Sequence, residues 1–200
     1  MGRLRSAVPA VAIFAILGIV DGVHAGAAKT EPELHVAVRI DDKADVPGVL
    51  LKFAKARAAE VFAMSGVKVD WVDAVDTGRL KLVTPYTILI MPEAPGSLKV
   101  AMAHIGVDLM GQGAPSVGRA YIYYDRVLKN GSIPPRDASA TLGDVIAHEL
   151  GHLILPPGHS NAGIMRRAIN MTTRRLETFT DVEAKEIRER FPRQIAEETR

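Results

Sequence analysis

The chain has 200 residues, of which 24% are charged and 48% are hydrophobic, and its formal net charge at pH 7 is +2. This length suits one domain with a sizeable core, and the near balance of charge does not indicate a nucleic-acid partner or any strongly charged partner. The sequence has no cysteine, which excludes disulfides, thiolate metal ligands and a lipid-modified N-terminal cysteine.

The N-terminal stretch has the pattern of an export signal. Two arginines precede an apolar run from Ala7 to Val20, and Ala25 places a small residue at the expected cleavage position. The run is too short for a membrane span. We therefore predict a signal peptide over residues 1–25 and a single mature domain over residues 26–200, without a stable membrane span. The expected location is secreted or periplasmic, by bacterial export, and a retained membrane anchor is the alternative.

The mature domain begins with three strands and one helix. Residues 34–40 and 67–71 alternate apolar and polar side chains, which predicts two strands, and residues 86–91 form the continuous apolar run of a buried central strand. Residues 47–65 repeat apolar side chains with helical spacing, and Gly66 supplies a stop signal. The helix residues that we expect to face the core are Val49, Leu50, Phe53, Ala54, Val61 and Phe62.

The middle of the domain predicts two more strands. Residues 98–105 are interpreted as an edge strand, followed by the glycine-rich residues 106–118. Residues 119–127 alternate again and predict a half-buried strand, and residues 130–136 predict a turn region. An extended peptide can pair with an edge strand through backbone hydrogen bonds, so the edge strand is where we expect a peptide to bind.

The next helix carries the strongest functional signal. His148, Glu149 and His152 read H-E-x-x-H, and histidines four residues apart lie one turn apart on nearly the same face of a helix. Their ring nitrogens can therefore bind one metal ion. Glu149 borders this site without being forced to ligate, as suits a general base for metal-activated water.

The sequence also predicts where this helix starts and ends, and it offers two residues that could orient His148. Thr141, with Asp144 three positions on, predicts its start, and Pro156-Pro157 predicts its end. Asp144 lies one turn before His148 and is a candidate for orienting that ring, as is Ser160.

The helix supplies two ligands, so a third must come from beyond it. His159 is seven residues past His152, and Gly158 directly before it can supply a left-handed turn. Imidazole is a better zinc ligand than the hydroxyl and amide groups that follow His159. A carboxylate of Asp181 or Glu183 is the alternative third ligand.

The motif and the residues that follow it resemble those of a known clan of peptidases. H-E-x-x-H, a histidine after a turn, and then Gly163-Ile164-Met165 are similar to the metzincin zinc peptidases, which carry H-E-x-x-H-x-x-G-x-x-H followed by a Met-turn. Here the third histidine comes one residue later, and Leu155 stands where the clan has its turn glycine. The stretch also resembles uncharacterised secreted bacterial H-E-x-x-H proteins ending in G-I-M-R.

The resemblance implies a bound Zn²⁺ with His148, His152 and His159 as ligands. It also implies that Met165 packs beneath these rings as a hydrophobic floor and does not bind the metal. The last predicted element is a helix over residues 180–195, which begins with Thr180 and an acid three positions on.

Together these features predict an α+β fold, a metzincin-like zincin domain with a twisted mixed sheet, the active-site helix, a Met-turn and a C-terminal helix. The predicted function is zinc-dependent peptide-bond hydrolysis by an endopeptidase, with a peptide or protein as substrate. The alternative is a secreted zinc-containing domain that binds peptides or cell-surface material with little or no turnover. No sequence feature indicates an oligomeric state.

Overall fold

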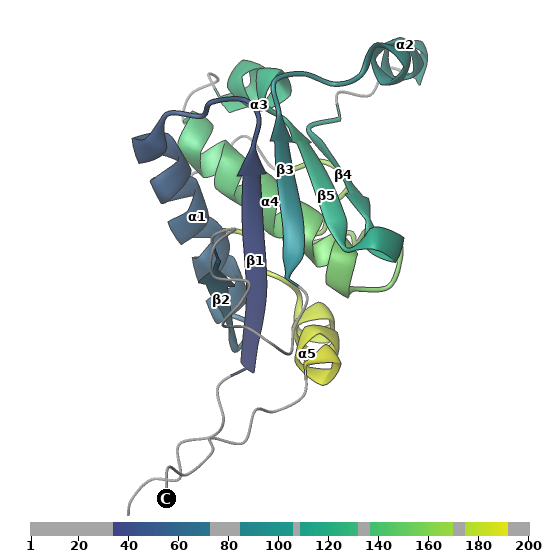
Figure 1. Ribbon diagram of the computed structural model, residues 1–200. Helices are drawn as coiled ribbons and strands as arrows, with labels where there is room; N and C mark the ends of the chain where they lie inside the picture. Colours follow the sequence, from purple (N-terminus) through teal and green to yellow (C-terminus); the bar gives the residue numbers. More distant parts are fainter. Residues whose placement is uncertain (1–33, 73–84, 106–108, 132–136, 170–174, 192–200) are drawn as a thin grey trace, which may run out of the picture. The chain divides into compact units, whose positions relative to one another are not determined.

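The computed structural model describes residues 34–72, 85–105, 109–131, 137–169 and 175–191, with only the backbone described at positions 101–105. The predicted signal peptide over residues 1–25 lies outside these ranges. The elements, in chain order (Figure 1), are β1 (Leu34–Asp42), α1 (Gly48–Ala63), β2 (Val67–Trp71), β3 (Tyr86–Met91), α2 (Gly96–Ile105), β4 (Gly111–Ala114), the short 3-10 helix η2 (Pro115–Val117), β5 (Arg119–Tyr123), α3 (Tyr124–Gly131), α4 (Ala138–Ile154) and α5 (Asp181–Arg190).

The strands form one mixed sheet in the order β2-β1-β3-β5-β4. The pairs β1–β2, β1–β3 and β3–β5 are parallel, and β4 runs antiparallel to β5 at one edge. A mixed sheet is what the sequence led us to expect. The three strands predicted at residues 34–40, 67–71 and 86–91 are confirmed, and β1 continues to Asp42.

One face of the sheet packs against α1 and α4 and forms the core (Figure 1). Val36, Ile88 and Ile122 of the sheet share this cluster with Phe62 of α1 and Ile146 of α4, and each is at most 2% exposed. Helix α4 is buried along nearly its whole length, and within the H-E-x-x-H segment only His152 is partly exposed. In the part of the chain that the structure describes, no helix is long and apolar enough to span a membrane.

The predicted edge strand at residues 98–105 is wrong, because these residues belong to helix α2. Leu98, Met102 and Ile105 are spaced by four and three residues, which is also helical spacing, and the intervening Lys and Ala are good helix formers. The edge strand next to β5 is instead β4, within the segment that we had interpreted only as glycine-rich.

The predicted strand over residues 119–127 is correct only up to Tyr123. Helix α3 starts at the next residue and continues to Gly131, into the predicted turn region. The residues that follow the strand have helical spacing, since three and four residues separate Tyr124, Val127 and Gly131.

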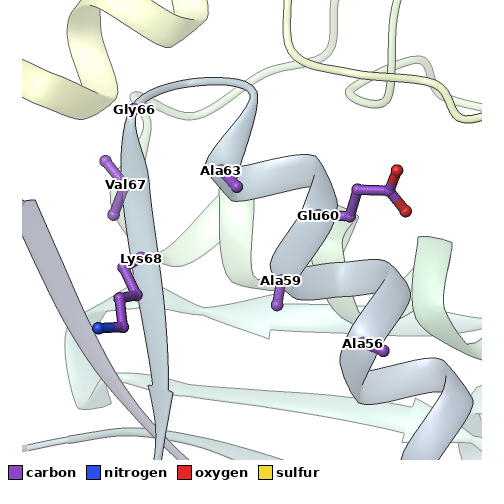
Figure 2. Close-up of a pocket in the computed structure, with 7 residues that line it drawn as sticks. All are labelled: Ala56, Ala59, Glu60, Ala63, Gly66, Val67 and Lys68. Atoms are coloured by element: carbon purple, nitrogen blue, oxygen red, sulfur yellow. The ribbon is translucent and has the colours of Figure 1, made fainter.

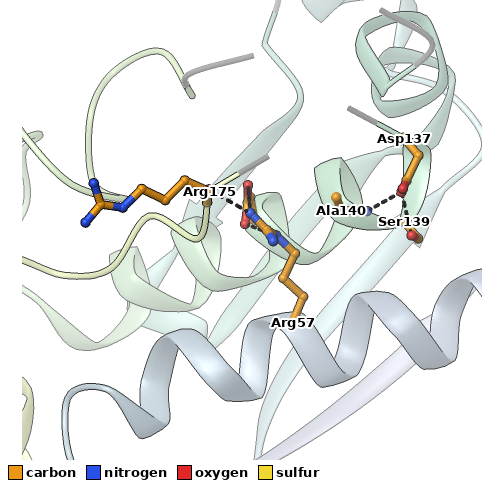
Figure 3. Close-up of polar contacts among 6 residues, drawn as sticks. Arg57, Asp137, Ser139, Ala140 and Arg175 are labelled. Atoms are coloured by element: carbon orange, nitrogen blue, oxygen red, sulfur yellow. Dashed lines mark hydrogen bonds and ion pairs between the residues drawn. The ribbon is translucent and has the colours of Figure 1, made fainter. Parts of the chain in front are cut away.

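Helix α4 begins one turn earlier than predicted. Asp137 is its N-cap, with the Asp137 carboxylate accepting a 2.8 Å hydrogen bond from the Ala140 N–H (Figure 3). Thr141 is therefore an interior, fully buried residue. The predicted stop holds, since the helix ends at Ile154 before the two prolines.

Helix α1 differs from its prediction in which side chains it buries. Val49 and Phe53, expected in the core, are 66% and 60% exposed, and the buried residues are Ala54, Ala58, Val61 and Phe62. Between α1 and the edge strand β2 lies a surface groove of about 590 Å³, shown in Figure 2. None of its lining residues belongs to the H-E-x-x-H segment.

Candidate metal centre

The two histidines of α4 face each other as their spacing predicts. The Nε2 atoms of His148 and His152 are 3.0 Å apart, and the two ring planes are nearly perpendicular, at 85°. His148 is 6% exposed and His152 is half-buried. One ring is therefore inside the protein and the other stands at the border with solvent.

His159 joins these two rings from the turn after the helix. Its ring centroid lies 5.4 Å from that of His148 and 4.8 Å from that of His152. Gly158 has φ 141°, a backbone conformation that residues with a side chain rarely adopt. The positive φ agrees with the left-handed turn predicted at this glycine. A ligand nitrogen from each of the three histidines lies within 4.8 Å of the other two.

The ring of His148 is oriented by a main-chain carbonyl. Its Nδ1 lies 2.8 Å from the carbonyl oxygen of Ile164, so Nδ1 carries the proton and the lone pair of Nε2 points toward the other two histidines. Ile164 is itself held, because its N–H donates to the carbonyl of Thr178 at 2.9 Å.

Asp144 and Ser160, the two candidates for orienting His148, form hydrogen bonds with other groups. The Asp144 carboxylate, which is fully buried, accepts hydrogen bonds from Arg57 of α1 at 2.6 and 3.2 Å. The Ser160 hydroxyl donates to the Ala162 carbonyl at 2.5 Å and so closes the turn.

Met165 packs under the helix at the level of the histidines. It is 2% exposed, and a Cβ added to Gly151 of α4 would lie 2.5 Å from the Met165 sulfur. Because Gly151 has no side chain, Met165 can pack directly against helix α4 between His148 and His152.

Electrostatics keep the three imidazoles neutral. Burial lowers the pKa of His148, and it lowers the pKa of His152 to about 4, where the other two histidines add to the effect. Burial, and then the charge of Arg167, lower the pKa of His159. Near neutral pH each ring therefore offers an unprotonated nitrogen, the form that binds a metal.

Glu149 is held between α4 and the edge strand β4. It is 4% exposed, and burial raises its pKa to about 8. A hydrogen bond from the Gly113 backbone lowers this pKa, but by less than burial raises it. Its Oε2 has no hydrogen-bond partner among the described residues. A buried, unsatisfied carboxylate oxygen costs free energy unless another group, such as water or a cation, completes its surroundings.

Two glycines of β4 make this arrangement fit, and sequence reasoning missed them. A Cβ at Gly111 would lie 2.6 Å from Glu149 Oε1, and a Cβ at Gly113 would lie 2.8 Å from the Cβ of His152. The available signal was a glycine pair in a strand, which indicates a close approach of the backbone to another group.

The alternative carboxylate ligands are placed differently. Glu183 forms a capping box with Thr180, in which its Oε2 accepts from the Thr180 N–H at 2.8 Å. Among the described residues, neither Glu183 nor Asp181 belongs to the group that can hold a metal. Glu183 does line a hollow of about 200 Å³ beside His159, together with Glu186 and Met165.

The donor set fits a zinc ion. Neutral histidines are zinc ligands, and two ligand nitrogens of a tetrahedral zinc site lie about 3.3 Å apart, close to the 3.0 Å between His148 and His152. Three protein ligands leave one position of a tetrahedral zinc ion open. Glu149, next to His148 in the sequence, has an oxygen that finds no hydrogen-bond partner among the described residues.

The fold is similar to that of a solved structure named as a zinc-dependent peptidase. A zinc-dependent peptidase from Methanocorpusculum labreanum matches with a TM-score of 0.50 and 17% sequence identity, over 76% of this chain and 99% of that one. An archaemetzincin from Methanopyrus kandleri matches with a TM-score of 0.46 and 14% identity, over 82% and 98%. The sequence matches no protein-family model and no curated protein. At these identities the likeness concerns the fold.

Proposed function

We propose that this chain is a zinc-dependent endopeptidase of the metzincin type. The observation that carries the proposal is the convergence of three neutral histidines next to a buried glutamate, one oxygen of which has no partner within the described part of the chain. The fold likeness to a structure named as a zinc-dependent peptidase supports it. In this interpretation the turn around Met165 is the Met-turn, with Met165 as the floor of the site.

His148, His152 and His159 would hold the ion. Zinc, when bound, polarises the scissile carbonyl and lowers the pKa of water toward neutrality. Glu149 accepts the proton of the attacking water and passes it to the leaving amine. Its buried carboxylate is a stronger base than an exposed one, although a nearby cation opposes that rise in pKa.

The peptide substrate would lie along β4. This strand is at the edge of the sheet and pairs with β5 on one side. A peptide paired with its other side would be held by backbone hydrogen bonds and would run next to Glu149, which Gly111 and Gly113 contact from the same strand.

The decisive test is Glu149→Gln. We expect the variant to bind zinc as the native protein does, because the histidines are untouched, and to hydrolyse peptides about 10²–10⁴-fold more slowly, because an amide cannot accept the proton. Metal content and cleavage of unfolded proteins, followed by mass spectrometry, are the measurements. Glu60→Gln, on the exposed side of α1, is the matched control.

The outcomes separate the two candidate functions. Equal activity in Glu149→Gln would remove this residue from the mechanism. A native protein that binds zinc but cleaves no peptide would favour the peptide- or surface-binding alternative.

We also propose that the domain is exported to the periplasm or the medium after cleavage behind Ala25. The support is the charged start, the short apolar run and the small residue at the cleavage position. The expected result is a mature N-terminus at Gly26 in exported material, measured by mass analysis. Recovery of the uncleaved chain in the membrane fraction would contradict it.

A further inference from the structure

Arg57 of α1 links helix α4 to the segment around Arg175. Its Nε and Nη2 donate to the two oxygens of Asp144 at 2.6 and 3.2 Å, and Asp144 lies one turn before His148 on α4. The Asp144 side chain is fully buried and that of Arg57 is 16% exposed. A charge-assisted pair of this kind is geometrically specific, because the fork of the guanidinium fits the carboxylate in one orientation.

The same guanidinium also holds the segment behind the predicted Met-turn. Nη2 donates to the carbonyl of Arg175 at 3.2 Å (Figure 3). Three residues later the Thr178 carbonyl accepts from the Ile164 N–H, and the Ile164 carbonyl is the partner of His148 Nδ1. The chain of contacts therefore runs from Arg57 to the group that orients the His148 ring.

The packing around this link leaves Arg57 little freedom. A Cβ at Gly143 would lie 2.8 Å from both the Ala54 carbonyl oxygen and the Arg57 Cβ, so α1 and α4 are in close contact here. Five residues further along α1, the ring of Phe62 meets that of Phe179 edge-on, with centroids 4.9 Å apart. Helix α1 thus contacts the 175–179 segment at two places, by a hydrogen bond and by an aromatic pair.

We propose that Arg57 is a positioning residue for the metal centre: it fixes the place of His148 relative to the carbonyl of Ile164 by binding Asp144 and the Arg175 carbonyl together. This inference rests on the proposed zinc function. It assigns a role in metal binding to a helix that contributes no ligand.

A purely stabilising role makes a different prediction. Removing one partner of a buried ion pair destabilises a protein strongly, whereas replacing both partners with apolar residues of similar size is often neutral or stabilising. Stability can therefore be restored without restoring the link to Arg175. If Arg57 positions His148, a variant that has lost the contact with Arg175 should bind zinc more weakly even when it is as stable as the native protein. If Arg57 only stabilises the fold, such a stable variant should bind zinc normally.

The experiment compares Arg57→Lys, which keeps the charge but loses the fork, with the double variant Arg57→Met/Asp144→Leu. Zinc affinity is measured by competition with a chelator, thermal stability by circular dichroism, and kcat and KM on one peptide. Lys185→Met/Glu189→Leu is the matched control, because it removes an exposed ion pair on α5.

We expect zinc affinity to fall about 10-fold in both Arg57 variants, the lower end of the loss seen for groups that orient metal ligands. The double variant should keep most of the native thermal stability, kcat should fall more than KM changes, and the control should behave like the native protein. Native zinc affinity in Arg57→Lys, or in a stable double variant, would overturn the inference. If the native protein itself binds no zinc, the proposed function fails instead.

Discussion

Gly111→Ala tests the placement of Glu149 without touching a metal ligand. The added Cβ would lie 2.6 Å from Glu149 Oε1 and 2.7 Å from its Cδ and Cγ, whereas ordinary contact begins at 3.4 Å. Ordinary contact is restored only if the carboxylate and the strand separate by about 0.8 Å, the difference between 2.6 and 3.4 Å. A displacement of about 1 Å at a reacting group can cost about 10²-fold in rate, or about 2.7 kcal/mol of barrier.

We expect kcat for peptide cleavage to fall about 10²-fold in this variant, with zinc affinity unchanged. Gly113→Ala is the informative contrast, because its Cβ would lie 2.8 Å from the Cβ of His152 and should weaken zinc binding as well. Gly48→Ala is the control, since nothing lies within 4 Å of its added Cβ. A Gly111→Ala enzyme with native kcat and native zinc content would refute the role given to this contact.

His159→Ala should weaken zinc binding strongly, whereas Asp181→Ala and Glu183→Ala should leave it near normal; competition with a chelator decides, and the reverse pattern would replace His159 with a carboxylate ligand. Thr180→Ala should lower the free energy of unfolding by about 1 kcal/mol, because it removes half of the capping box of α5; denaturant unfolding of the metal-free protein measures this, and an unchanged midpoint would show that the cap contributes little.

The features that local periodicity specifies could be predicted from the sequence. A spacing of four residues on a helix fixes the relative position of His148 and His152, whatever the rest of the fold is. Glycine at position 158 and the capping pair at Thr180 are local as well, and the structure confirms both. Residues 98–105 were assigned to the wrong element because a short apolar stretch satisfies both periods.

The features that depend on distant contacts could not be predicted. β4 contains glycines because Glu149 and His152 approach its backbone, and tertiary packing of this kind overrides their low strand propensity. The partner of His148 is a main-chain carbonyl, a group that every residue has, so no residue type marks it. Arg57 and Asp144 are 87 positions apart, and nothing in the sequence around either residue predicts their contact.

The chain order of the site has a consequence for how it assembles. The three histidines and the Ile164 carbonyl come from one short, continuous stretch, so bringing them together closes only small loops, at a low entropic cost. Glu149 is placed by β4, a four-residue edge strand that must pair with β5 first, and short edge elements are among those that open locally in native proteins. The histidine cluster and the Glu149 side chain are thus positioned by elements that we expect to differ in local stability. A molecule in which β4 has opened would keep the histidine cluster and lose the strand that contacts Glu149 and on which we propose that the peptide binds.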